Sequence, residues 1–293
     1  MDINTLRDFI AKRDSISILE TVDVHTGARS VLKEFDYVIE APNWTRDGQY
    51  LVYNSRGRLY TYALSTTEIK EIDTGFAIDC NNDHVLSPNN TQVAISHFTN
   101  DDATSRIYVL PLNGGQPVRV TEKGPSYLHG WSPDGQRLAY CAERGGQYDI
   151  YTISVNSGPE TQLTDLPGLD DGPEYSPDGR YIWFNSTRTG LMQIWRMNVD
   201  GSNPTQMVTE EANCWFPHVS LDGQWVAYIA YGKNDVAAGD HPANKNVELR
   251  LVPASGGASK TIVKLFGGQG TMNVNSWSPD NRTLAFVAYR LKP

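Results

Sequence analysis

The chain has 293 residues, a formal net charge of −9, and 39% hydrophobic against 20% charged residues. This acidic balance excludes the basic stripe that neutralises nucleic-acid phosphates, so we predict no nucleic-acid partner. The sequence also lacks an apolar run of about 18 residues, so we predict no membrane-spanning helix and no membrane partner.

Residues 1–14 are predicted to form either one short amphipathic helix or an extended N-terminal tail. Ile3, Leu6 and Ile10 would share one face of that helix. The segment has no basic stretch followed by an apolar core, so it differs from a secretory signal and a cytoplasmic location is expected. If a signal peptide has been removed from the chain, the expected location is the periplasm. Residues 15–293 are expected to form a single domain.

A turn motif, Ser132-Pro-Asp-Gly135, recurs along the remaining chain. Proline presets φ, the aspartate can bond its own backbone, and glycine accepts a positive φ, so the motif is typical of a tight turn. A short apolar segment follows it, such as Leu138–Tyr140. The Asp or Asn of the motif falls at positions 47, 89, 134, 178, 222 and 280, so successive copies lie 42, 45, 44, 44 and 58 residues apart.

A period of about 40–45 residues with four short strands in each unit is typical of propeller blades. We therefore predict an all-β fold, a six-bladed β-propeller with four antiparallel strands in each blade. Two strands within residues 15–35 precede the first turn motif, whereas only one strand follows the last. The N-terminal strands are therefore expected to complete a blade with residues 274–290, which closes the ring and removes open sheet edges.

The order of segments within each unit resembles that of TolB-type propeller repeats. The turn motif is followed by a Leu-Ala-Tyr strand, an Ile-Tyr strand, a glycine-containing turn and a Leu-Thr ending, as at 138–140, 150–151, 156–158 and 163–164. Three further segments resemble a subgroup of small, stand-alone TolB-like proteins: Trp215-Phe-Pro-His218, Asp240-His-Pro242 and Gly267-Gly-Gln-Gly-Thr-Met-Asn273. The resemblance implies a propeller without the N-terminal domain of TolB.

Innermost strands line the channel of a propeller, so the residues just before each turn motif are expected to guard its mouth. Three of the six histidines lie there, His84, His129 and His218, and we predict that they hold a divalent metal. The predicted catalytic residues are His84, His218 and Glu174, because imidazoles and a carboxylate can supply an acid/base pair. The alternative is that these side chains only solvate the mouth or brace loops.

Other residues of the same strands and loops are expected to bind the ligand. The long segment 231–246 is predicted to lean over the mouth and to bring Asp240, His241 or Lys245 toward the ring. Trp215 is predicted to offer a stacking platform to a ring-shaped ligand. The predicted ligand-binding residues are Asn82, Asp83, Tyr127, His129, Asp171, Trp215, His241, Gln269 and Asn273.

This pattern favours the binding of a small polar ligand, such as a sugar or uronic acid, at the channel mouth. Whether the chain is an enzyme stays open; if it is, we expect a metal-assisted lyase or hydrolase, because oligogalacturonate lyase resembles it in blade type. A non-catalytic scaffold for a protein or peptide, as in TolB-like propellers, is the alternative. A regulatory propeller detached from a peptidase is a third, although the absence of a Gly-x-Ser-x-Gly motif excludes a serine peptidase.

Overall fold

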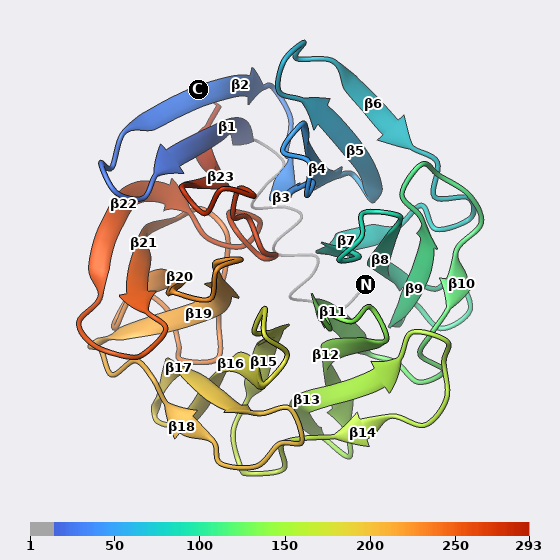
Figure 1. Cartoon of the computed structure of the whole chain (residues 1–293), viewed down its shortest axis with the longest axis vertical. Coiled ribbons are helices and arrows are strands. Elements are labelled where there is room, and N and C mark those ends of the chain that lie inside the picture. The colour runs from blue at the N-terminus through green and yellow to red at the C-terminus, as the bar shows by residue number, and fades with distance from the viewer. Residues whose placement is uncertain (1–14, 293) are drawn as a thin grey trace.

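The computed structural model describes residues 15–292, which form six β-sheets around a central axis (Figure 1). The helix or tail predicted for residues 1–14 lies outside the described residues. Between residues 15 and 292 every regular element is a strand, so this part of the chain has no helix long and apolar enough to cross a membrane. The predicted six-bladed, all-β propeller is confirmed.

Five blades contain four antiparallel strands each, which run in chain order from the channel outward. Blade one contains β3 (Glu40–Trp44), β4 (Tyr50–Ser55), β5 (Arg58–Ala63) and β6 (Ile69–Ile72). Blade two contains β7 (Cys80–Leu86), β8 (Gln92–Phe98), β9 (Ser105–Pro111) and β10 (Val118–Arg119). Blade three contains β11 (Ser126–Trp131), β12 (Arg137–Arg144), β13 (Gln147–Ser154) and β14 (Thr161–Gln162).

The next two blades repeat this order. Blade four contains β15 (Asp170–Tyr175), β16 (Tyr181–Thr189), β17 (Leu191–Asn198) and β18 (Thr205–Gln206). Blade five contains β19 (Ala212–Val219), β20 (Trp225–Gly232), β21 (Lys245–Pro253) and β22 (Lys260–Gly267). The long segment of the sequence therefore connects the second and third strands of blade five, as predicted.

The sixth blade joins the two ends of the chain. Strand β1 (Ser15–Asp23) pairs with β2 (Arg29–Phe35) on one side and with β23 (Thr283–Leu291) on the other. The innermost position is held by residues 271–277, which pair with β23 through the bridge between Trp277 and Leu284. N- and C-terminal strands thus share one sheet, which confirms the predicted closure and leaves no open edge between the first and last blades.

The six turn motifs share one hydrogen-bond pattern, which explains why their residues recur. In the third copy, Ser132 Oγ donates to Asp134 Oδ1 at 2.6 Å, and that oxygen accepts the backbone N–H of Gln136 at 3.0 Å. Gly135 follows with a φ of 74°, in the left-handed region that favours glycine. The repeated aspartates are therefore turn residues, and the motif places six equivalent turns at one end of the channel.

The hydrophobic core lies between neighbouring blades. One cluster joins Leu19 and Val287 of the closing blade to Leu51 and Tyr53 of blade one, and all four side chains are fully buried. Burying a side chain of this size stabilises the fold by about 1.5–3 kcal/mol, so each blade depends on contacts with its neighbours. This packing holds the innermost strands at fixed positions around the channel.

Candidate functional site

A cavity of about 270 Å³ occupies the end of the channel where the turn motifs lie. Each blade contributes the residue that occupies the proline position of its turn. These six residues are Arg46, Pro88, Pro133, Pro177, Leu221 and Pro279. Below them the wall is partly aromatic, with Trp44, Trp131 and Trp277. Four prolines make the rim rigid. Blade one instead presents the cation Arg46, and blade five presents the flexible apolar side chain of Leu221.

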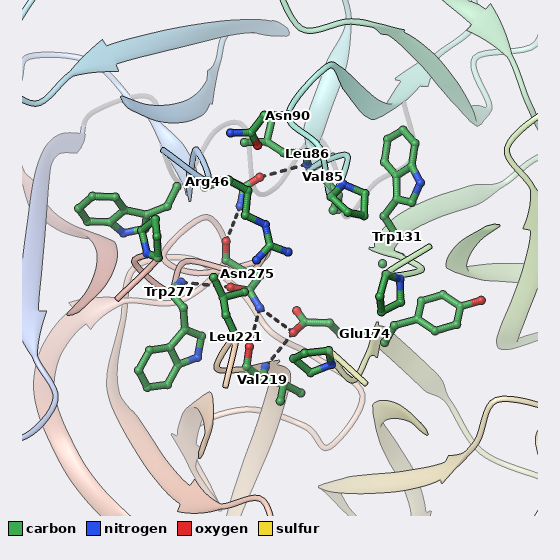
Figure 2. A pocket seen from close by; sticks show the side chains of 18 of the residues that line it. Arg46, Val85, Leu86, Asn90, Trp131, Glu174, Val219, Leu221, Asn275 and Trp277 are labelled. Atoms are coloured by element: carbon green, nitrogen blue, oxygen red, sulfur yellow. Dashed lines mark hydrogen bonds between the residues drawn. The ribbon is translucent and has the colours of Figure 1, made fainter. Parts of the chain in front are cut away.

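Glu174 of β15 forms the centre of a polar network at the floor of this cavity (Figure 2). Its Oε1 accepts the backbone N–H of Val219 and the side-chain amide of Asn275, both at 2.7 Å. Its Oε2 lies 2.8 Å from His218 Nδ1. The carboxylate of blade four is thereby tied to blades five and six.

His218 has both ring nitrogens engaged. Its Nε2 lies 3.1 Å from the carbonyl oxygen of Met272, which can only accept, so Nε2 donates. The contact between Nδ1 and the Glu174 carboxylate therefore requires a proton shared between the two groups. His218 and Glu174, two predicted catalytic residues, are brought together, but their polar atoms are directed at each other and at the backbone.

Arg46 extends from the rim into the middle of the cavity (Figure 2). Its side chain is exposed, and within residues 15–292 its guanidinium forms no ion pair or hydrogen bond at standard distances. Asn43 of β3, by contrast, has both polar atoms of its side chain engaged. Its Nδ2 donates to Asn275 O at 2.5 Å, and its Oδ1 accepts the N–H of Leu86 at 3.2 Å. Although its side chain is exposed, partial burial of the guanidinium lowers the pKa of Arg46, and the carboxylate of Glu174 opposes that shift. The hydrogen-bond donors of Arg46 are therefore available to a negatively charged ligand in this cavity.

His129 lies at the boundary between this cavity and a second, more deeply buried polar cluster. Its Nε2 lies 3.1 Å from Asp171 Oδ1. Burial disfavours the charged ring, but the carboxylates of Asp171 and Asp83 outweigh that effect and raise the pKa of His129 to about 9. Burial in turn raises the pKa of Asp83 to about 6, against the attraction of His129. The carboxylates of Asp171 and Asp83, from the two blades that flank blade three, thus favour the charged form of His129.

The segment between β20 and β21 reaches the same cluster, as predicted. His241 Nδ1 lies 2.8 Å from Gln269 Oε1, which also accepts the amide of Asn273 at 2.7 Å. Gln269 Nε2 continues to Asn82 Oδ1 at 3.5 Å. Seven of the predicted ligand-binding residues therefore meet in one cluster: Asn82, Asp83, His129, Asp171, His241, Gln269 and Asn273.

The remaining predicted site residues lie elsewhere. His84 is buried between blades, with Nε2 3.3 Å from the carbonyl oxygen of Val52, and burial lowers its pKa to about 4. Trp215 is fully buried, with its ring centroid 4.3 Å from that of His241, so its faces are not available as a stacking platform. Tyr127 is half-buried, 6.4 Å from the ring of Tyr148.

The predicted metal ligands do not converge. His84 contacts a backbone carbonyl, His218 contacts Glu174, and His129 contacts Asp171. Across residues 15–292 there is no group of three or more His, Cys, Asp or Glu side chains placed to hold a metal ion. The expected trio is corrected accordingly: the inner strands direct the three rings into three different contacts between blades.

Two residues of the cavity were missed from the sequence: Arg46 and Leu221. A sequence pattern could have identified both, because they replace the proline of the turn motif in copies one and five. Asn275 lies just before the last turn motif, where residues of the channel are expected, but its contacts with Glu174 and Val219 of other blades could not be read from the sequence.

Comparison with known proteins gives one family. The TolB beta propeller domain (PD40) matches residues 85–257. An uncharacterized protein of Agrobacterium fabrum is 46% identical over 274 residues, which is 93% of this chain and 92% of that protein. The Tol-Pal system protein TolB of Francisella tularensis is 29% identical over 131 residues, 43% of this chain and 30% of that protein.

Solved structures agree with this assignment of the fold. A TolB-like protein from Agrobacterium tumefaciens superposes with a TM-score of 0.90 at 45% identity, and covers 94% of this chain and 99% of its own. Oligogalacturonate lyase in complex with manganese superposes with a TM-score of 0.58 at 15% identity, over 93% of this chain and 82% of its own. At that identity the likeness concerns the fold alone.

Proposed function

The chain belongs to the TolB β-propeller family, and we propose that it is a non-catalytic scaffold that binds a segment of a partner protein in the turn-motif cavity. One observation carries this proposal: the acid that lines the cavity, Glu174, is occupied by His218, which does not line it, and by Val219 and Asn275. Glu174 accepts three hydrogen bonds, and both nitrogens of His218 are engaged. A general acid or base must reach a proton of its substrate, so this pair supports bracing over catalysis.

The lining of the cavity suits a polypeptide. Pro88, Pro133 and the tryptophans offer apolar walls, and Arg46 adds one exposed cation. Pockets that bind by shape combine such walls with a few polar groups, and arginine is enriched in protein interfaces. A volume of about 270 Å³ lies just below the range of about 300–1,000 Å³ for drug-sized ligands, which favours one or two side chains of a partner.

A small sugar acid, such as a uronic acid, is the second candidate. The observation that favours it is the position of His129, which borders the cavity and could meet a carboxylate or hydroxyl there, with its Nε2 3.1 Å from Asp171 Oδ1. The described residues do not fit a metal, so we derive no metal-assisted elimination or hydrolysis.

Photo-crosslinking in cells tests the first proposal. A benzoylphenylalanine in place of Leu221 on the cavity rim should form an adduct with one defined protein. The same group in place of Asn234, an exposed residue of the loop between β20 and β21 at the other end of the channel, is the matched control. An adduct at both positions, or at neither, contradicts the proposal.

The second candidate predicts a different outcome. Galacturonate or glucuronate should then raise the melting temperature of the purified protein, and substitution of Arg46 by Gln should remove that rise. A cross-linked protein without such a rise supports the scaffold.

A further inference from the structure

A groove of about 760 Å³ opens on the same face as the cavity, between blades four and five. Residues of the turns in both blades line it, together with Arg196 and the segment that follows β21. Pro177, Val219 and Leu221 line both the groove and the cavity. The two hollows are therefore neighbours across one rim, and that rim carries leucine where four other blades carry proline.

The guanidinium of Arg196 in β17 is fixed in this groove in an orientation that suits an anion. Its guanidinium lies 4.4 Å from the ring centroid of Tyr181 and 5.4 Å from that of Trp183. Its Nη1 donates to the carbonyl oxygen of Ala254 in blade five at 3.2 Å. Within residues 15–292, its Nε and Nη2 donate no hydrogen bond and the side chain forms no ion pair. Stacking and one anchored nitrogen fix the plane of the group, and its remaining donors match the two oxygens of a carboxylate.

The other charged side chains of the groove have hydrogen-bond partners. Arg180 donates to Asp178 Oδ2 at 2.6 Å. Asp222 Oδ1 accepts the hydroxyl of Ser220 at 2.6 Å and the N–H of Gln224 at 3.0 Å, as the turn requires. Within residues 15–292, Arg196 is thus the cation of the groove without an ion pair, as Arg46 is in the cavity, where the Glu174 carboxylate attracts Arg46 without forming one.

We infer that the groove is a second subsite for the same partner segment, and that this segment is acidic and extended, with one carboxylate on Arg46 and another on Arg196. The inference rests on the proposed function, because it assigns the cavity and the groove to one polypeptide. Leu221, on the shared rim, contacts the stretch of the segment that lies between the two acidic residues. The net charge of −9 repels acidic polymers in general. Binding of an acidic peptide would therefore require a local cationic site, which makes it a stringent test of the inference.

Calorimetry with a capped hexaglutamate peptide tests the inference, with capped hexaglutamine as the neutral control. The wild-type protein should bind hexaglutamate only, and Arg196→Gln and Arg46→Gln should each weaken binding about tenfold, the equivalent of ~1.4 kcal/mol. Arg180→Gln removes a cation that Asp178 already neutralises, so it should change the affinity less than about twofold.

A measurement on the wild-type protein tests the inference even if the Arg196 variant fails to fold. Hexaglutamate should protect Arg196 from modification by phenylglyoxal, as measured by mass spectrometry, and should leave Arg180 reactive. Absence of hexaglutamate binding, or equal effects of the Arg196 and Arg180 substitutions, overturns the inference. If Arg46→Gln weakens binding and Arg196→Gln does not, the cavity remains a binding site and the groove is excluded. Failure of the photo-crosslink at position 221 would instead remove the proposed function itself.

Discussion

His218 Nδ1 lies 2.8 Å from Glu174 Oε2, across the boundary between blades four and five. Each residue lies two positions before the serine of its turn motif, Ser176 or Ser220, so the two are structurally equivalent. The ring brings equivalent positions of neighbouring blades together at the channel, and here it brings together an acid and a base. The pair therefore serves first to connect blades four and five.

Removal of the Glu174 carboxylate should destabilise the fold strongly. Glu174→Ala leaves the buried N–H of Val219 and the Nδ1 of His218 without their acceptor, and it removes one of the two acceptors of the Asn275 amide, which keeps Val219 O. Since each buried group left unpaired costs about 1–3 kcal/mol, we expect the free energy of unfolding to fall by about 3 kcal/mol or more. Urea denaturation measures this change.

A surface glutamate provides the control for that experiment. Glu211 is exposed and pairs with the exposed Lys233, so Glu211→Ala should change the free energy of unfolding by less than about 1 kcal/mol. An equally small loss for Glu174→Ala would show that the side chain is dispensable for folding and would restore it as a catalytic candidate.

The buried ring of His84 should make the protein acid-sensitive. Burial lowers its pKa in the folded state to about 4, whereas the value in an unfolded chain is 6.5. Below pH 6.5 the unfolded state therefore binds the proton more readily, and stability is lost as the pH falls from 6.5 toward 4. From pH 7.5 to pH 5, wild type should lose about 2 kcal/mol more than His84→Gln, whose side chain does not titrate. Urea titrations of both proteins at the two pH values measure this; parallel losses would contradict it.

His129 should show the opposite pH dependence. Its pKa is raised to about 9 in the folded protein by Asp171 and Asp83, despite burial. The stabilisation from its charge is complete below pH 6.5, the value for an unfolded chain, and is lost as the pH rises through 9. Asp171→Asn removes the nearer carboxylate and should lower the pKa of His129 by about one to three pH units. NMR of the imidazole resonance, assigned with His129→Gln, measures it; an unchanged midpoint would exclude the ion pair.

The fold could be predicted because its cause is local. Each turn motif is stabilised by hydrogen bonds among its own residues, such as that between Ser132 and Asp134. Six copies of the motif therefore predict six blades without any knowledge of tertiary contacts. The cluster around His129 could be predicted for a related reason: polar residues at the start of each inner strand must meet at a single axis once the ring closes.

The partners of those residues could not be predicted. The innermost strands change register between Glu40 and Asn43, between Asp171 and Glu174, and between Trp215 and His218. Ala41, Gly172 and Phe216 take a positive φ at these bulges. A bulge re-aims the side chains that follow it, so strict alternation along the strand fails there. Trp215 precedes the bulge of its strand; it was expected at the ligand but is fully buried in the core.

Arg46→Pro should separate folding from binding. Proline occupies the same position in four other turns, and the N–H of Arg46 donates no backbone hydrogen bond within residues 15–292. Proline also reduces the freedom of the unfolded chain, so the free energy of unfolding should stay the same or rise by about 0.4–1 kcal/mol. The cavity would nevertheless lose its exposed cation, so the cross-link from position 221 should disappear. Arg46→Gln, which removes the charge and keeps the flexible backbone, should lose the cross-link equally, because the guanidinium is the group that both substitutions remove. A variant with proline at position 46 that still forms the adduct would contradict a role for Arg46 in binding.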